Sequence, residues 1–237
     1  MLAIPSMELV RGTCNGPRPA QGNPEAAPAA HPVSAARSWA HVGFRRLHVA
    51  DRDADDREGS NGAMLEDIIR DGALEIQAAG GIESTEGIER LSGCGAFRIV
   101  LGARALDEPH WLAEVADLYP DVLLVRTDVR ERRVVTRGWV RNLPLDIFDV
   151  IDDLRGLPLA GLLLTAVGSG ISRSSQELSL LEDVAESCDF PVIAVGGVTT
   201  MNDLRALEHR GVAAVLLDDV LLSGELDAQA VAQEFAT

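Results

Sequence analysis

The chain has 237 residues, 46% of them hydrophobic, and its 37 acidic and 21 basic side chains give a formal net charge of -16. Because binding to nucleic acid or to an anionic membrane depends on a cationic surface, this charge excludes both as non-specific partners. All 21 basic residues are arginine, which excludes lysine Schiff-base chemistry and lysine-dependent phosphate loops.

The length suits one well-buried core, and we expect a single domain over residues 1–237. Cys14, Cys94 and Cys188 are too far apart for a CxxC metal or redox motif, which favours a reducing compartment. No apolar run approaches the roughly 18 residues that span a bilayer, and the first residues do not resemble a secretion signal. We therefore expect a soluble, cytoplasmic protein.

Eight apolar runs of strand length recur along the chain, each followed by a loop or a helical pattern. Four expected strands lie at 2–7, 46–50, 122–127 and 159–164. Two more lie within 77–105 and two within 193–221. The expected helices lie near 33–42, 64–70, 107–118, 144–154, 175–187 and 227–235, with one more in each of the two double-strand segments. This spacing is typical of βαβ units.

The connections have distinct compositions. A proline-rich loop covers 12–32, and 132–140 is predicted to form a small hairpin. The acidic segment Asp51–Gly62 lacks the glycine and the final acid of a calcium loop, so we interpret it as a solvated loop. His48, within a strand, is expected to be a packed core residue.

Residues 77–105 return in degraded form at 193–221, with matched positions at an offset of 116. Each copy has a strand, a Gly-Gly turn, a helix opened by Ser or Thr, and a second strand. A repeat of nearly half the chain predicts a (β/α)8 TIM barrel built from two duplicated half-barrels. A doubly wound sheet is the alternative, although it accommodates the duplication less easily.

In a (β/α)8 barrel the active site is built at the C-terminal ends of the strands. Glu8 and Asp128 end the first and fifth expected strands, which suits an acid and a base on opposite sides of a substrate. Thr165 ends the sixth. Carboxylates at strand ends are also common as helix caps or solvated loop residues, so position alone leaves both interpretations open.

The glycine turns are the candidates for anion binding. Gly80 and Gly81 precede a helix that opens at Ser84, so free backbone N–H groups and the helix dipole could hold a phosphate without lysine. Tight packing of a strand-to-helix turn explains a Gly-Gly pair equally well. The corresponding candidates elsewhere are Gly102, Gly196 and Gly197.

Several motifs, AIPSMEL, RLHVAD, GGIES, LGARAL, TRGW and VIAVGGVTTMNDLRAL, resemble the phosphoribosylformimino-AICAR-phosphate isomerase family of histidine biosynthesis over essentially the whole chain. The resemblance implies an Amadori rearrangement of an aminoaldose to an aminoketose, with no cofactor and no metal. It places the base at Glu8, the acid at Asp128 and a supporting threonine at Thr165, and it places the two substrate phosphates at the Gly-Gly turns and the strand ends that follow them.

The sequence also departs from this family. Glu8 replaces an aspartate, Glu83 follows the first Gly-Gly turn, the loop 166–172 has no acid, and Asp218-Asp219 ends the last strand, where two carboxylates would repel a phosphate. Two alternatives therefore stay open: a member acting on another, singly phosphorylated substrate, or a non-catalytic relative that binds a metabolite or a protein. The expected partner is a small phosphorylated metabolite, and the expected assembly is a monomer or a small homo-oligomer.

Overall fold

The computed structural model describes residues 1–14, 31–136, 141–166 and 175–236. The chain divides into two compact units. The N-terminal unit comprises Leu2–Ile99 and Leu216–Thr237, and the central unit comprises Met1 and Val100–Val215. Parallel strands alternate with helices along the chain, so the fold is the (β/α)8 barrel that the sequence predicts.

The strands of the N-terminal unit form a parallel ladder in the order β5-β4-β3-β1. The ladder is nearly continuously buried, as expected for parallel strands whose two faces are both covered. A short antiparallel strand pairs with the end of β1. The bounds are β1 Leu2–Val10, β2 Thr13–Cys14, β3 Arg46–Asp51, β4 Glu75–Ala79 and β5 Arg98–Leu101.

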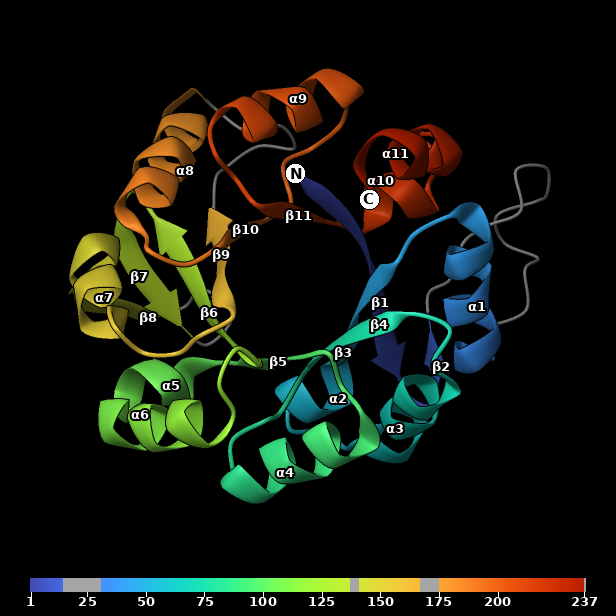
Figure 1. Ribbon diagram of the computed structural model, residues 1–237, viewed down its shortest axis with the longest axis horizontal. Helices are drawn as coiled ribbons and strands as arrows, with labels where there is room; N and C mark the ends of the chain where they lie inside the picture. Colours follow the sequence, from blue (N-terminus) through green and yellow to red (C-terminus); the bar gives the residue numbers. More distant parts are fainter. Residues whose placement is uncertain (15–30, 137–140, 167–174, 237) are drawn as a thin grey trace. The chain divides into compact units, whose positions relative to one another are not determined.

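Three helices cover the outer face of this ladder: α1 Pro32–Val42, α3 Gly62–Asp71 and α4 Thr85–Cys94 (Figure 1). Their apolar side chains point inward at helical spacing, and in α3 these are Leu65, Ile68 and Ile69. The unit is completed by α2 Arg52–Asp55, α10 Asp219–Leu222 and α11 Ala228–Phe235.

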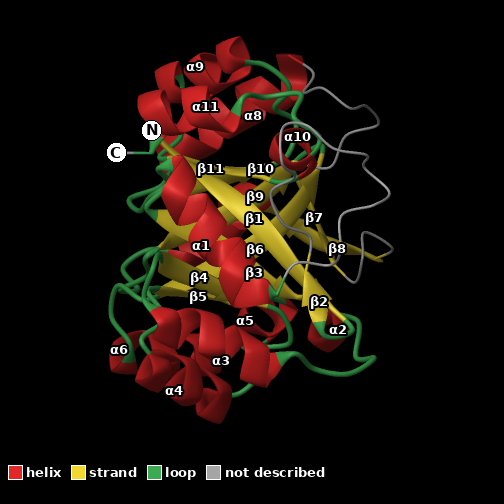
Figure 2. Cartoon of the chain, turned by 90° about the vertical axis from the view of Figure 1, so that its right-hand side faces the viewer, coloured by secondary structure: helices red, strands yellow, loops and turns green. Residues whose placement is uncertain are grey.

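The central unit has its own parallel ladder, β6-β9-β10, extended by an antiparallel hairpin (Figure 2). The strand bounds are β6 Leu123–Arg130, β7 Arg133–Thr136, β8 Arg141–Asp146, β9 Gly161–Ala166, β10 Val192–Val195 and β11 Ala214–Leu217. The helix bounds are α5 Ala103–Asp107, α6 Pro109–Leu118, α7 Ile147–Leu154, α8 Ser175–Ser187 and α9 Met201–His209.

The two copies of the repeat have the same local structure. In each, both glycines of the Gly-Gly turn have positive φ, between 63° and 104°. The helix that follows is capped by the side chain of Ser84 in the first copy and of Thr200 in the second, at the predicted offset. The predicted duplication explains this likeness, and it stays a prediction.

The expected strand ends at Glu8 and Asp128 are wrong, for a common reason. The sequence predicts that Glu8 and Asp128 follow their strands, but β1 continues to Val10 and β6 to Arg130. In both cases the chain folds back as an antiparallel strand, β2 or β7, which pairs with the last residues of the parallel strand and prolongs it. Both carboxylates therefore lie within strands.

Other segments also differ from expectation, and Thr165, like the two carboxylates, lies within its strand, which continues to Ala166. The expected helix 107–118 is interrupted at Glu108, whose non-helical backbone (φ -129°, ψ 72°) precedes Pro109, so α5 ends before α6 begins. The expected helix 144–154 starts only at Ile147, because β8 continues to Asp146, which then caps α7. The loop after Asp51 contains α2. Most of the proline-rich loop, most of the TRGW motif and most of the acid-free loop 166–172 lie outside the described residues.

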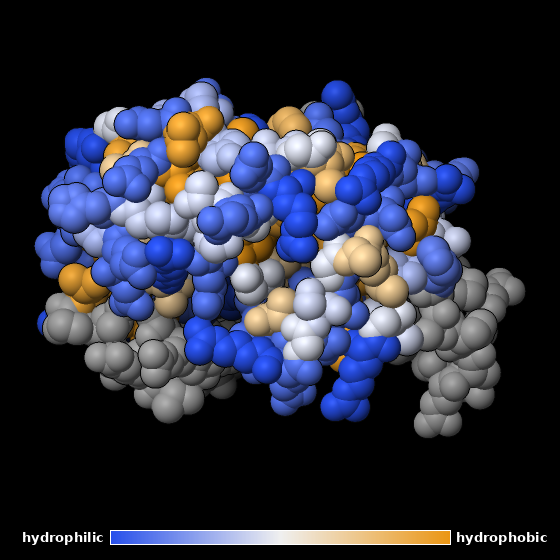
Figure 3. Space-filling view, turned by 90° about the horizontal axis from the view of Figure 1, so that it is seen from below, coloured by the Kyte–Doolittle hydropathy of each residue, from blue (hydrophilic) through white to orange (hydrophobic). Residues whose placement is uncertain are grey.

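The core is apolar and the visible surface is mostly hydrophilic. His48 is 6% exposed, which confirms that it is a packed core residue. Among the described residues, the exposed large hydrophobic side chains are Val10 and Leu118, and Figure 3 shows one face on which apolar side chains are scattered among polar ones. Within the described part of the chain, no helix is both long and apolar enough to span a bilayer.

Candidate functional site

In the N-terminal unit, Glu8 lies beside the end of β3. The parallel register pairs Glu8 with Ala50 and Leu9 with Asp51, so the residue that follows β3, Arg52, reaches the Glu8 side chain. The Arg52 Nε lies 3.7 Å from the Glu8 Oε1, an ion pair between two half-exposed side chains. Both charges are at the surface, so Glu8 is accessible to a molecule in solution.

Asp51 is a structural carboxylate. Only 2% of the residue is exposed, and its side chain accepts hydrogen bonds from the backbone of Ala54 and Asn61 and from the side chains of Ser60 and Asn61, at 2.6 to 3.3 Å. It thereby caps α2 and fixes the loop that leads to α3. The prediction of a solvated acidic loop is wrong at this residue, because four donors compensate the burial of its charge.

Asn61 connects this loop to the hairpin that follows Glu8. Its amide nitrogen donates to the Leu9 carbonyl at 3.3 Å and to the Asp53 carboxylate at 3.0 Å, and its amide oxygen accepts from the Gly12 N–H at 2.9 Å. The Asp53 carboxylate also accepts from the backbone of Arg11, at 2.7 Å. A buried polar network therefore holds the β1–β2 turn against the β3–α3 loop.

The first Gly-Gly turn is packed tightly against the end of β3. A Cβ atom at Gly80 would lie 2.7 Å from the Asp51 nitrogen and closer still to its carbonyl oxygen, and one at Gly81 would lie 2.7 Å from the Ala54 Cβ. Both positions therefore need glycine for close approach as well as for positive φ. This supports the packing interpretation of the turn.

The polar groups around this turn are already engaged. The Gly81 N–H donates to the Asp55 carboxylate at 3.0 Å, and the Ser84 hydroxyl accepts from the Gly87 N–H. The Glu83 carboxylate accepts from Arg57 at 3.1 Å. A phosphate at Gly80 and Gly81 would thus have to replace Asp55, and phosphate binding here stays a prediction.

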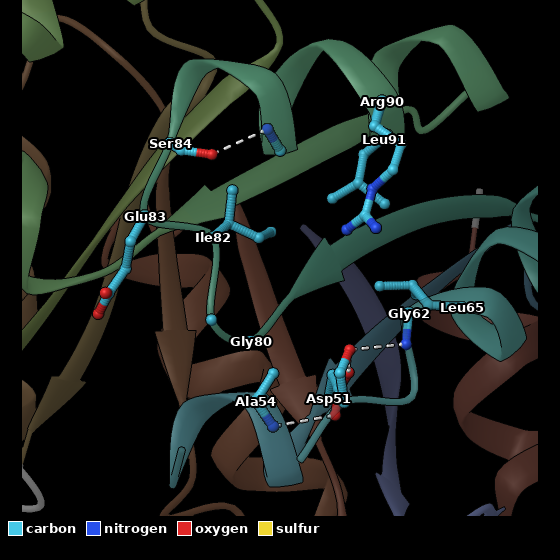
Figure 4. Close-up of a pocket in the computed structure, with 13 residues that line it drawn as sticks. Asp51, Ala54, Gly62, Leu65, Gly80, Ile82, Glu83, Ser84, Arg90 and Leu91 are labelled. Atoms are coloured by element: carbon cyan, nitrogen blue, oxygen red, sulfur yellow. Dashed lines mark hydrogen bonds between the residues drawn. The ribbon is translucent and has the colours of Figure 1, made fainter. Parts of the chain in front are cut away.

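Behind the turn is a cavity of about 140 Å³ between the N-terminal ends of α3 and α4. Its lining includes buried Asp51, apolar Leu65 and Leu91, and the guanidinium group of Arg90. Figure 4 shows the Arg90 guanidinium pointing toward Gly62, while Glu83 extends away on the other side of the turn. Arg90 is also paired with Glu66, at 3.5 Å. Glu8 does not line this cavity.

In the central unit the structure brings two predicted site residues together. Asp128 of β6 and Thr165 of β9 are direct partners in the parallel register, and Val195 of β10 is the partner of Thr165 on the other side. Gly196 follows Val195 at once. The C-terminal parts of these strands therefore present a carboxylate, a hydroxyl and a glycine turn in one row.

Asp128 is held by an arginine on its own strand. The Arg126 Nε donates to Asp128 Oδ1 at 3.2 Å, and a terminal guanidinium nitrogen donates to Oδ2 at 3.3 Å. The two residues are two positions apart, so both side chains lie on the same face of β6. The Asp128 side chain is 11% exposed, which places its charge in a largely desolvated position where this pairing matters.

The remaining glycine candidates differ from the first turn. Among the described residues, and apart from the chain neighbours of each glycine, no atom would lie within 4 Å of a Cβ added at Gly196 or at Gly102. Gly102 is exposed and begins α5 without a side-chain cap. Gly197, with φ of 69°, precedes a helix whose capping box is formed by Thr200 and Asp203.

Asp218 and Asp219 follow β11, where the sequence predicts repulsion of a phosphate. Asp218 caps α10 by accepting from the Asp219 N–H at 2.8 Å. Desolvation of the Asp218 carboxylate, together with the charge of Asp219, raises its pKa although the backbone hydrogen bond acts in the opposite sense. Local hydrogen bonding thus gives Asp218 a capping role in the fold.

Sequence reasoning missed three features: Arg126, Arg52 and the Asn61 network. The first had a visible signal, because Arg126 and Asp128 share the two-residue period of a strand face. Arg52 pairs with a residue 44 positions away, and Asn61 with residues on two loops, so only the register of β1 with β3 reveals them.

A barrel with a carboxylate and a hydroxyl in register in the C-terminal parts of two strands has the construction of a (β/α)8 enzyme. Comparison with known proteins defines the family. Residues 3–227 match the family described as Histidine biosynthesis protein. The chain belongs to this family.

Individual relatives match over most or all of their length. A protein of Gemmatimonas aurantiaca is 43% identical over 235 residues, 99% of each chain, and one of Myxococcus xanthus is 38% identical over 237 residues, 100% of each. A protein of Halobacterium salinarum is 34% identical over 86% of each chain. All three are named 1-(5-phosphoribosyl)-5-((5-phosphoribosylamino)methylideneamino) imidazole-4-carboxamide isomerase. These similarities favour the isomerase over the two alternatives that the sequence left open.

Proposed function

We propose that the protein is an aldose–ketose isomerase of histidine biosynthesis, which converts the phosphoribosylformimino-AICAR-phosphate aminoaldose to the corresponding aminoketose. The observation that carries this proposal is the 43% identity with a named isomerase over 99% of both chains. The similarity covers the strands of the barrel, at whose C-terminal ends such an enzyme places its chemistry.

The proposed chemistry divides the work between two carboxylates. Asp128 protonates the ring oxygen of the aminoaldose as the ring opens, and Glu8 removes the proton at C2 so that the double bond can move. Thr165, adjacent to Asp128 in the strand register, donates a hydrogen bond within the same part of the site. The exposure of Glu8 and the engaged but partly exposed Asp128 are compatible with these roles.

Substrate phosphates are proposed to bind at the glycine turns, Gly80-Gly81 with Gly102 in one copy of the repeat and Gly196-Gly197 in the other. The open space around Gly102 and Gly196 supports this more directly than the packed first turn does. We further propose a single-domain enzyme, a monomer or a small homo-oligomer, that acts without metal or cofactor in the cytoplasm.

The test is turnover of the purified protein with the aminoaldose substrate, followed by the change in absorbance or by chromatography. The wild type is expected to convert it, whereas Glu8→Gln and Asp128→Asn are expected to lose at least about 100-fold in kcat, as is usual for a general acid or base. The matched control is Asp149→Asn, an exposed carboxylate in α7 that should leave kcat unchanged. A folded wild type that neither turns over the substrate nor restores growth to a cell lacking the isomerase would refute the proposal.

A further inference from the structure

The Asp128 carboxylate accepts a bidentate pair of hydrogen bonds from the Arg126 guanidinium, at 3.2 and 3.3 Å. Such a fork fixes the carboxylate plane as well as its position, because a guanidinium matches both oxygens at once. Both residues belong to β6, so the geometry is set by a strand that is hydrogen-bonded on both sides, to β7 and to β9. A site held by strands is more precise than one on loops.

The burial of the pair also indicates that the Asp128 carboxylate is held in a fixed position. The Asp128 side chain is 11% exposed and that of Arg126 36%, so the contact is shielded and the arginine still reaches the surface. The residue between them, Thr127, is 1% exposed and faces the opposite side of the strand. Arg126 therefore lies two residues before Asp128 in β6, on the same face of the strand, which is the face that carries the proposed chemistry.

Resting on the proposed function, we infer that Arg126 is a positioning residue for the proton transfer of Asp128. When the ring opens, the C1–O bond breaks with its electron pair going to oxygen, the lone pair of the substituent nitrogen forms a C1=N bond, and the Asp128 proton ends on the new hydroxyl. The negative charge left on Asp128 then faces the Arg126 guanidinium. A fixed cation beside a developing charge lowers the barrier of the step in which the charge appears.

The role is distinct from substrate binding. A residue that binds substrate equally in the ground and transition states changes KM, whereas one that acts on the proton transfer changes kcat. Arg126→Gln, which keeps hydrogen-bonding groups without the charge, is expected to lower kcat by about 100-fold with KM within about threefold of wild type. Arg126→Lys restores the charge without the fork and is expected to recover about tenfold of this loss.

The chain offers a matched control. Arg132 forms the same kind of two-pronged pair with Asp146, at 3.1 and 3.3 Å, elsewhere in the central unit. Arg132→Gln removes an equivalent pair and is expected to leave kcat within about twofold, because loss of a pair at the surface has little effect on stability or structure. Thermal unfolding of all variants shows whether each is folded at the assay temperature, and Arg126→Lys carries the test if Arg126→Gln is not.

A double-mutant comparison completes the experiment. If Arg126 acts through Asp128, then adding Arg126→Gln to Asp128→Asn leaves the residual turnover unchanged within about threefold, because coupled residues are not additive. An active wild type with an equally active Arg126→Gln, a rise in KM at constant kcat, or full additivity in the double variant would each overturn the inference while leaving the isomerase function standing. A wild type without turnover would overturn both.

Discussion

Gly80 lies directly against the backbone of Asp51, so that a methyl group at position 80 would overlap the Asp51 carbonyl oxygen. The contact joins the turn after β4 to the end of β3. The two strands are neighbours in the ladder, where Ala79 of β4 is the partner of Ala50 of β3. A glycine turn that sequence reasoning assigns to phosphate binding thus also determines how closely two loops can pack.

Gly80→Ala is expected to destabilise the protein by about 2 to 4 kcal/mol, because it combines a positive φ of 104° with a clash against backbone atoms that cannot move aside. The control is Gly196→Ala in the second copy, where φ is 72° and no atom of the described residues beyond the chain neighbours would lie within 4 Å of the new Cβ. That variant is expected to lose only about 1 kcal/mol from backbone strain. Urea unfolding measures both, and equal losses would contradict the packing argument.

Asn61→Ala is expected to cost about 2 to 4 kcal/mol of unfolding free energy, because it leaves the buried Asp51 carboxylate and the Gly12 N–H without their Asn61 partners. Asn202→Ala, which removes an exposed amide that accepts from Arg205, is expected to change stability by less than about 0.5 kcal/mol. Chemical unfolding of the two variants measures the difference. A loss below 1 kcal/mol for Asn61→Ala would show that water replaces the network.

Arg52→Gln is expected to lower kcat by no more than about fivefold, because a 3.7 Å ion pair between half-exposed groups contributes about 1 kcal/mol at most. The control is Arg57→Gln in the same loop, which loses its pairing with Glu83 and is expected to leave kcat unchanged. Steady-state kinetics of both variants test this. A hundredfold loss on removal of Arg52 would mean that it acts in the reaction itself.

Two aspartates are expected to change stability with pH in opposite senses. Burial disfavours the ionised Asp203 carboxylate, but hydrogen bonds from Thr199 and Thr200 outweigh it and hold its pKa below the ordinary 3.8. The stabilisation by Asp203 is therefore present above pH 3.8 and is lost as the pH falls through the lowered pKa. Asp203→Asn is expected to be less stable than wild type at pH 7, with the difference shrinking in acid.

The pKa of Asp218 is shifted in the opposite direction, so its effect on stability has the opposite pH dependence. Desolvation raises its pKa, so the favourable protonated state is present below pH 3.8 and is lost as the pH rises through the raised pKa. Asp218→Asn, which keeps a capping oxygen, is expected to be more stable than wild type at pH 7 and to lose this advantage in acid. Thermal unfolding between pH 3 and pH 7 checks both variants, and parallel curves for the two would contradict the assignment.

Much of the fold follows from local patterns. Helix α8 begins and ends at the predicted residues, and the caps at Ser84 and Thr200 occupy the positions that their residue types favour. The errors arise where the partner of a segment is distant in space or folds back. Strand β1 continues past Glu8 because β2 pairs with it, and β8 replaces the first turn of an expected helix because it pairs with β7.

The sequence by itself determined the alternation of strands and helices, the glycine turns and the family, because all three depend on the order of residue types along the chain. Only the tertiary structure decided what those residues contact: Thr165 beside Asp128, Arg126 on the Asp128 carboxylate, Arg52 near Glu8, and Asp51 as a buried cap. Strand register sets the first and third of these contacts, and register depends on hydrogen bonds between segments that are distant in the sequence. The other two depend on how side chains are oriented within one strand and one loop.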